Sequence, residues 1–250
     1  MFQLNIKMPE EPSVSLVTVT QYSRRDCLAN LSMLIKKQIY KNITEWVIVE
    51  GSKTAEEAEE NAGHIVEMKD LLIIPIVYLP FAEGQHLSDL RNMGNAACKG
   101  DIIVCLDDDD YYPPTRVSHA VYALVNSTRL IAGCSKAYIY FYQTGQFFQF
   151  NSFGKGHSTN NCLAYKRAYL ENHHHLPGLD KAEESSFTNE FTEPMEQLDP
   201  AKTIVISGHG SNTVNKSLIS PDMVTELYSP TIVDYIPLPI LMKMEKIFGM

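Results

Sequence analysis

The sequence has few cysteines, and their arrangement excludes two common classes of small-protein scaffold. The five cysteines are odd in number, widely spaced and contain no CxxC pair. A zinc site or a disulfide framework is therefore not expected. Several lie inside apolar stretches, where a free cysteine behaves as a small hydrophobic residue. We expect a reducing, cytoplasmic setting. The cysteines are Cys27, Cys98, Cys105, Cys134 and Cys162.

Long apolar runs and an excess of basic residues are also missing. No apolar run approaches the roughly 18 residues that span a bilayer, so we expect no membrane span. The opening stretch MFQLNIKMPEEPS has no basic segment followed by an apolar one, so we expect no signal peptide. The formal net charge of −9 argues against nucleic acid as a partner, because phosphate binding needs clustered Lys and Arg. An anionic small molecule stays compatible if a metal ion or a local Arg supplies positive charge.

Alternating apolar and amphipathic segments fill the first half of the 250-residue chain. This alternation predicts an α/β fold with a mostly parallel, Rossmann-like central sheet and helices on both faces. Ligands of such sheets bind beyond the carboxyl ends of the strands. The expected strands are 14–20, 46–49, 71–79 and 102–106, and the expected helices are 23–37, 54–68, 86–99 and one that opens at Pro113-Pro114.

The second half has a less regular pattern. The apolar and aromatic stretch 130–150 contains Thr144-Gly145 as a turn signal and predicts a hairpin whose aromatic rings pack in its core. A last strand is expected at 203–207. The three consecutive histidines at 173–175 are expected at the surface of a loop.

Four consecutive aspartates, at 107–110, follow the apolar strand 102–106. One interpretation is a solvated acidic loop. The other is a site for a hard divalent cation such as Mg²⁺ or Mn²⁺, which takes oxygen ligands and keeps waters and substrate phosphates. A buried strand leaves its terminal side chains little freedom to spread into solvent, which favours the cation site.

The surrounding run LRNMGNAACKGDIIVCLDDDDYYPPTRV resembles the nucleotide-sugar glycosyltransferases of the GT-A fold, in particular glycosyltransferase family 2. Their pattern is an Arg-Asn-x-Gly helix, a Lys/Arg-Gly turn, an apolar strand, Leu-Asp-x-Asp-Asp and then a proline. A DxD alone is a weak signal, but this linked run is specific. The matching residues are Arg91, Asn92, Gly94, Gly100, Leu106, Asp107, Asp109, Asp110 and Pro114.

The resemblance continues on both sides of this run. VSLVTVTQYSRR is similar to the opening strand and turn of the family, with Val19 where a proline is usual. WVIVEGSKT is similar to its second strand, with Glu50 where the second Asp of Val-Asp-Asp-Gly-Ser stands. Glu183-Glu184 lies where the family has Glu-Asp, and His209-Gly-Ser-Asn-Thr resembles a downstream motif that contains a histidine.

The resemblance implies a metal-dependent transferase that moves a sugar from a UDP-sugar to a hydroxyl of a saccharide or protein-linked acceptor, with inversion. It also implies the domain boundaries. A GT-A domain would cover 14–216, with a nucleotide-sugar-binding half at 14–126 and an acceptor and catalytic half at 127–216. Residues 1–13 and 217–250 would be terminal extensions.

The resemblance further implies a role for each site residue. Glu184 would be the base that takes the proton of the acceptor hydroxyl, with Glu183 and Asp180 as competitors. Asp109 would bind Mn²⁺ or Mg²⁺ and His209 would complete the metal shell, whereas Asp110 is expected to cap the next helix. The donor-binding residues would be Thr18, Thr20, Glu50 (to the imide N–H of uracil), Arg91 (to the base or diphosphate), and Asp107 and Asp108 (to the ribose or in support of the metal).

Two alternatives stay open from the sequence. A nucleotidyltransferase acting on sugar phosphates would share the layout, but its glycine-rich phosphate loop has no counterpart in QYSRR. A non-catalytic nucleotide-sugar-binding module of the same fold is compatible with the departures at Val19, Glu50 and Glu184. The intact Asp107-x-Asp109 pair argues against such a decayed site.

Overall fold

The computed structural model describes residues 11–69, 72–81, 84–210 and 219–249. The first ten residues, Leu71 of the expected third strand, and Ser211-Asn212-Thr213 of the histidine motif lie outside the described residues. Within the described ranges, no helix combines the length and the apolar character needed to cross a membrane.

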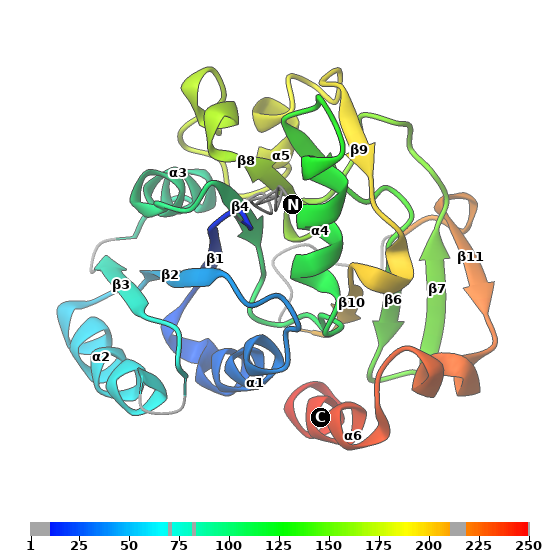
Figure 1. The fold of residues 1–250 in the computed structure, drawn as a ribbon. Helices are drawn as coiled ribbons and strands as arrows, with labels where there is room; N and C mark the ends of the chain where they lie inside the picture. The colour runs from blue at the N-terminus through cyan, green and yellow to red at the C-terminus, as the bar shows by residue number, and fades with distance from the viewer. Residues whose placement is uncertain (1–10, 70–71, 82–83, 211–218, 250) are drawn as a thin grey trace, which may run out of the picture.

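A seven-stranded sheet forms the centre of the fold (Figure 1). Its strands, in spatial order, are β3 (Ile76–Phe81), β2 (Ile43–Gly51), β1 (Val14–Thr20), β4 (Ile102–Cys105), β8 (Ala164–Lys166), β5 (Ile131–Gly133) and β9 (Met195–Gln197). The first four are mutually parallel, and only β8 runs antiparallel to its neighbours β4 and β5. The predicted mostly parallel sheet is confirmed.

Helices cover both faces of this sheet, as predicted. On one face Leu31 and Ile65 pack with Leu16 and Trp46 in the larger apolar cluster. On the other face Leu90 packs with Val17, Val49 and neighbouring apolar side chains. The helices are α1 (Arg25–Lys36), α2 (Ala55–Lys69), α3 (Leu87–Ala97), α4 (Arg116–Val125), α5 (Glu183–Phe187) and α6 (Leu238–Phe248).

Two glycines of the Arg-Asn-x-Gly and Lys-Gly motifs allow close packing of this layer. A Cβ on Gly94 would lie 2.8 Å from Cγ2 of Val17 and 3.1 Å from Cγ2 of Val49, so α3 approaches β1 and β2 closely. A Cβ on Gly100 would lie 2.4 Å from the backbone nitrogen of Ser15. A larger residue at Gly100 would clash with the backbone of β1, and one at Gly94 would push α3 away from the side chains of β1 and β2.

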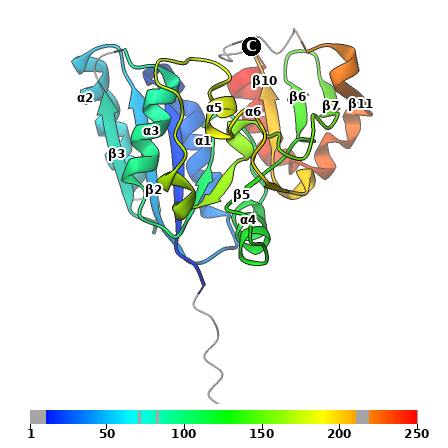
Figure 2. The ribbon, with the colours of Figure 1, turned by 90° about the horizontal axis from the view of Figure 1, so that it is seen from above.

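A smaller sheet lies on the opposite side of the molecule from α2 and β3 (Figure 2). Its order is β10 (Val205–Gly208), β6 (Tyr138–Phe141), β7 (Gln146–Phe150) and β11 (Val224–Leu227). β6 and β7 form the predicted antiparallel hairpin. The aromatic run packs as expected, because Phe147 is fully buried and its ring lies 5.7 Å from that of Tyr138 and 5.2 Å from that of Tyr235.

The described C-terminal residues pack against this body. β11 pairs with β7, α6 contacts α1, and the ring of Phe248 at the end of α6 stacks on His209 with centroids 4.3 Å apart. The segment expected to be a C-terminal extension therefore completes the smaller sheet and supports a site residue.

Candidate functional site

The predicted site residues gather where three parallel strands end. β1 is parallel to both β2 and β4, so Thr20, Glu50 and the aspartates that follow Cys105 all lie at one edge of the sheet. Tyr112 fixes the turn after β4, since its buried hydroxyl accepts a hydrogen bond of 2.7 Å from the N–H of Asp107.

The side chain of Asp108 is buried at this edge of the sheet. The hydroxyl of Thr20 donates to its Oδ2 at 2.6 Å, and Nη1 of Arg24 donates to its Oδ1 at 2.8 Å. Burial raises the pKa of Asp108 to about 7 although the charge of Arg24 opposes this shift. The structure thus joins the predicted residues Thr20 and Asp108, with the carboxyl group turned toward β1.

Asp109 and His209 come together from positions 100 residues apart in the chain. Nε2 of His209 lies 3.1 Å from Oδ2 of Asp109, and both side chains are buried. Nη1 of Arg24 contacts the same carboxylate oxygen at 2.8 Å.

This pair fits one kind of metal site. Over the part of the chain that the structure describes, no group of three or more His, Cys, Asp or Glu side chains is placed to hold an ion. A closed structural site is therefore not formed by these residues. Mg²⁺ and Mn²⁺, by contrast, are commonly held by one or two protein ligands together with waters and substrate phosphates. The carboxylate of Asp109 and the imidazole of His209 suit that coordination.

Arg24 is the residue of this cluster that sequence reasoning missed. It lies in a single 3-10 turn, Tyr22–Arg24, directly after β1, and its side chain is largely buried between two aspartates. Arg24 belongs to the QYSRR segment, which follows a strand expected to end at the same edge of the sheet as the aspartates. A buried run of carboxylates needs a nearby cation, and that requirement was the available signal.

Asp110 does not cap the next helix, contrary to the sequence-based expectation. Its Oδ1 accepts from the backbone N–H of Ser207 at 2.8 Å, and its Oδ2 accepts from Nδ2 of Asn161 at 2.7 Å. α4 begins only at Arg116, after Thr115, whose side chain makes no capping hydrogen bond. Asp110 therefore ties the smaller sheet and the segment of Asn161 to the aspartate turn.

Arg91 connects the aspartates to the acidic segment at 183–184. Its Nη1 donates to Oδ1 of Asp107 at 3.2 Å, and its Nε donates to Oε1 of Glu183 at 2.6 Å. Both contacts lie in a largely buried environment, with the side chain of Arg91 10% exposed. The helix α3 thus holds the nucleotide side of the predicted site against α5.

Glu184 lies in the first turn of α5, next to this ion pair. Burial and the neighbouring charge of Glu183 raise the pKa of Glu184 to about 7, while Arg91 acts in the opposite direction. A carboxylate with such a pKa is suited to accept a proton near neutral pH.

The two competitors for the role of base have other contacts. Glu183 is buried and paired with Arg91. Asp180 is exposed, lies 3.0 Å from Nδ1 of His86, and has a lowered pKa because of this hydrogen bond. These contacts favour Glu184 among the three.

Glu50 lies apart from the aspartates, at the end of β2. Its carboxylate is fully buried, accepts from the hydroxyl of Tyr78 at 2.8 Å and also accepts from the hydroxyl of Ser52. Thr18, by contrast, is engaged in the core, where its hydroxyl accepts from the indole N–H of Trp46 at 2.9 Å. The structure thus separates Thr18 from the other predicted donor-binding residues.

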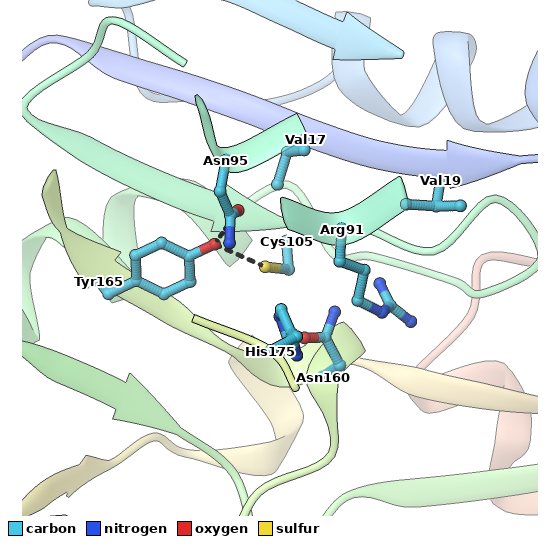
Figure 3. Close-up of a pocket in the computed structure, with 8 residues that line it drawn as sticks. All are labelled: Val17, Val19, Arg91, Asn95, Cys105, Asn160, Tyr165 and His175. Atoms are coloured by element: carbon cyan, nitrogen blue, oxygen red, sulfur yellow. Dashed lines mark hydrogen bonds between the residues drawn. The ribbon is translucent and has the colours of Figure 1, made fainter. Parts of the chain in front are cut away.

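A cavity of about 10 Å³, the size of about one water molecule, lies behind Arg91. Figure 3 shows Arg91, Asn160 and His175 around it, together with the hydroxyl of Tyr165, which donates to Oδ1 of Asn95 at 2.6 Å. A larger hollow of about 660 Å³ lies at the amino end of β4, beside Asp101 and Lys166. The aspartates follow the other end of that strand, so this hollow is separate from the site.

His175 is buried, which contradicts the expectation that the three histidines lie at the surface. It is 1% exposed, its ring stacks on Phe187 with centroids 4.4 Å apart, and its backbone N–H donates to Oδ1 of Asn92 at 2.9 Å. Burial, aided by the charge of Arg91, lowers the pKa of His175 to about 4. A neutral imidazole therefore packs beneath Arg91 and α5.

Solved structures share this fold. The mannosyltransferase PcManGT from Pyrobaculum calidifontis, in complex with GDP-Man and Mn²⁺, is 14% identical with a TM-score of 0.61, over 82% of this chain and 59% of that chain. TarS 1-349 from S. aureus is 15% identical with a TM-score of 0.59, over 78% of this chain and 60% of that chain. Its complex with UDP-GlcNAc is 15% identical with a TM-score of 0.57, over 84% of this chain and 62% of that chain.

The chain thus spans about three fifths of the length of these structures, and at such identities the likeness concerns the fold alone. A search of curated proteins finds no match. The sequence profile of glycosyl transferase family 2, however, matches residues 16–176, which include most of β1, all of β4 and the Arg-Asn-x-Gly helix. The resemblance seen in the sequence is thereby confirmed: the chain belongs to glycosyl transferase family 2 and has the GT-A fold.

Proposed function

We propose that this chain transfers a sugar from a UDP-sugar to the hydroxyl of a saccharide or protein-linked acceptor, with inversion, and that it uses Mn²⁺ or Mg²⁺. The observation that carries this proposal is the position of Arg91 between Asp107 and Glu183. This contact supports the proposal because it links Asp107, a carboxylate suited to the hydroxyls of a ribose, to the segment of Glu184, a carboxyl group suited to act as a base.

Asp109 and His209 are the residues that would hold the metal. When bound, the ion would supply positive charge to the departing nucleoside diphosphate. Arg24 lies against Asp108 and Asp109 and adds a permanent positive charge on the same side. Asp107, partly exposed beside Arg91, is the aspartate best placed to accept from the hydroxyls of the ribose.

Glu184 would act on the acceptor. Its carboxylate takes the proton of the acceptor hydroxyl while the acceptor oxygen forms a bond to the anomeric carbon. The bond between that carbon and the phosphate oxygen breaks at the same time, and the nucleoside diphosphate leaves with the electron pair. A single displacement of this kind inverts the anomeric centre.

Glu50 would select the base. A buried carboxylate that already accepts from Tyr78 and Ser52 is held in one orientation, and its oxygens can accept one further N–H. The imide N–H of uracil is such a donor. Solved structures of similar fold include one with GDP-Man and another with UDP-GlcNAc, so guanine is the base to compare against.

The experiment is a thermal-shift panel of UDP-glucose, UDP-N-acetylglucosamine and GDP-mannose, each with MnCl₂ or with EDTA. A ligand at 100 times its Kd stabilises the folded state by about 2.7 kcal/mol. We expect this stabilisation from a UDP-sugar with Mn²⁺ and a much smaller one in EDTA. Equal shifts in EDTA would contradict the role of the metal, a shift with GDP-mannose alone would contradict UDP, and no shift at all would contradict the proposed function.

A further inference from the structure

Three aromatic rings from two separate segments contact each other at the surface, outside the core of the smaller sheet. The ring centroids of Phe153 and His157 are 4.8 Å apart, and those of His157 and Phe191 are also 4.8 Å apart. Phe153 is 45% exposed, and the other two side chains are partly buried. Single exposed aromatic residues are common, but here two phenyl rings and the imidazole between them form one aromatic surface. We call these three residues the aromatic platform.

Polar contacts hold the segment of Phe153 and His157 in place. The backbone N–H of Phe153 donates to Oγ of Ser135 at 2.8 Å. Nε2 of Gln197, on β9, donates to the carbonyl oxygens of Lys155 at 3.0 Å and of His157 at 3.1 Å. The loop that follows β7 (Figure 1) is therefore fixed by the side chains of Ser135 and Gln197.

The segment of Phe191 has an unusual backbone. Asn189, Glu190 and Phe191 have φ values of 50°, 54° and 59°, all in the left-handed region. This conformation is uncommon for residues other than glycine and is an outlier for a bulky side chain. The two segments also approach closely, since a Cβ on Gly156 would lie 2.0 Å from the carbonyl oxygen of Phe191. Strained backbone that a fold retains is typical of functional positions.

Both segments of the platform continue into the candidate site. The N–H of Thr188 donates to the carbonyl oxygen of Glu184 at 3.0 Å, and the N–H of Glu190 donates to that of Ser185 at 2.7 Å. The turn that presents Phe191 therefore folds back on the helix of Glu184. The other segment runs on to Asn161, whose side chain contacts Asp110.

We propose that the aromatic platform binds the acceptor saccharide, an inference that rests on the proposed function. A pyranose has an apolar face of C–H groups that fits the face of an aromatic ring, whose electron density attracts polarised hydrogens. The hydroxyls at its edge need polar partners, and the chain neighbours of the platform include the exposed side chains of Lys155 and Asn189. The shared backbone with Glu184 places this surface on the acceptor side.

The experiment is saturation-transfer NMR on the full chain with the methyl α- and β-glycosides of glucose, galactose, mannose and N-acetylglucosamine, with and without UDP and MnCl₂. We expect saturation at the ring C–H protons of at least one glycoside. The double variant Phe153→Ala/Phe191→Ala should lower its affinity by about tenfold or more. Phe153→Tyr should keep it, and so should Tyr122→Ala, which removes a 71% exposed ring on α4.

The single variant Phe153→Ala should fold normally, because this exposed ring contributes little to the core. It should also weaken glycoside binding, which separates the loss of binding from misfolding. No signal from any glycoside with the wild-type chain, or unchanged affinity in both Phe153→Ala and the double variant, would overturn the proposal. Nucleotide-sugar binding by the wild-type chain is measured separately by thermal shift. If the wild-type chain binds a nucleotide sugar but the platform variants do not change glycoside affinity, this inference alone is overturned. If the chain binds glycosides but no nucleotide sugar, the proposed function is overturned.

Discussion

The two sides of the candidate site are built differently. On the donor side, Thr20, Glu50 and Asp107 each lie at the carboxyl end of a parallel strand, so their place at one edge of the sheet follows from the order of the chain. On the acceptor side, Glu184 lies on a helix of five residues that follows Ala182 in a left-handed conformation with φ 54°. Its position depends on contacts with distant residues.

This difference separates two kinds of positioning. A strand end is fixed by the hydrogen bonds of the sheet, and each strand is itself indicated by a local apolar pattern in the sequence. A short helix contributes little stability of its own, and α5 is held by the ion pair of Glu183 with Arg91 and by Phe187, which is fully buried. Single substitutions on the acceptor side should therefore mainly change the rate of transfer. Single substitutions on the donor side should mainly change the affinity for the nucleotide.

The largest effect is expected from Glu184→Gln. The amide cannot take a proton, so the rate of transfer should fall by about 10²–10⁴-fold, while calorimetry should give an affinity for UDP at least equal to that of the wild-type chain. Glu171→Gln, at an exposed carboxylate away from the site, is the matched control and should leave the rate unchanged. Full turnover in Glu184→Gln would refute the role of this residue and would leave the acceptor side without its base.

Asp109→Ala tests the donor side. Loss of a direct ligand should lower the Mn²⁺-dependent part of the UDP affinity by about 100-fold, and addition of EDTA should then have little further effect. Asp222→Asn, which changes an exposed carboxylate beside β11, should behave like the wild-type chain. If Asp109→Ala changed the rate at saturating donor and left the affinity intact, the division between the two sides would be wrong.

The pH dependence sharpens the comparison through Glu184. Because the carboxylate is the active form, kcat/KM should rise with pH through about 7. The folded-state pKa lies above the unfolded value of about 4.3, so the contribution of the neutral carboxyl to stability is fully present below that value. It is lost as the pH rises through about 7.

Glu184→Gln should consequently be more stable than the wild-type chain at pH 8, by on the order of 1–3 kcal/mol. The two chains should be close in stability at pH 4. Urea denaturation at both pH values measures this difference. An equal difference in stability between the two chains at pH 4 and at pH 8 would show that the pKa of Glu184 is not raised.

The smallest effect is expected from substitutions at Glu50, the residue proposed to contact the uracil ring of the donor. Glu50→Gln should reduce the affinity for UDP by about tenfold, because one acceptor oxygen is replaced by an amide group. Tyr78→Phe, which removes the hydrogen bond that orients Glu50, should reduce it less. GDP serves as the comparison ligand in the same titrations. An effect of either variant on GDP equal to that on UDP would assign Glu50 to the structure of the edge and not to base selection.

The fold could be predicted from the sequence because its signals are local. The apolar runs at β1 and β4 and the helical periodicity of α1 indicated the parallel half of the sheet, although the third strand, expected at 71–79, begins only at Ile76. The hairpin of β6 and β7 was indicated by its turn residues. The junction with the smaller sheet was not, since the contact of Asp110 with Ser207 joins residues 97 positions apart.

The site could be predicted only in part for the same reason. The aspartates and Arg91 were found through a linked motif, whereas Arg24 was missed because its partners are set by the tertiary fold. The three histidines have the same local sequence context, yet His175 is buried against Phe187, which lies on the next helix, and contacts Asn92, which is 83 positions away in the chain. Periodicity carries no information on such pairs.

The position of Arg91 between the two sides also makes them thermodynamically reciprocal. The charge of Asp107 raises the pKa of Glu184 and that of Arg91 lowers it, so proton binding at Glu184 responds to charge on the donor side. An anionic donor bound there would raise the proton affinity of Glu184, and by linkage the protonated chain would bind the donor more tightly. Donor affinity should therefore decline over the pH range in which the rate of transfer increases, and the pH of maximal flux at low donor should lie below that at saturating donor.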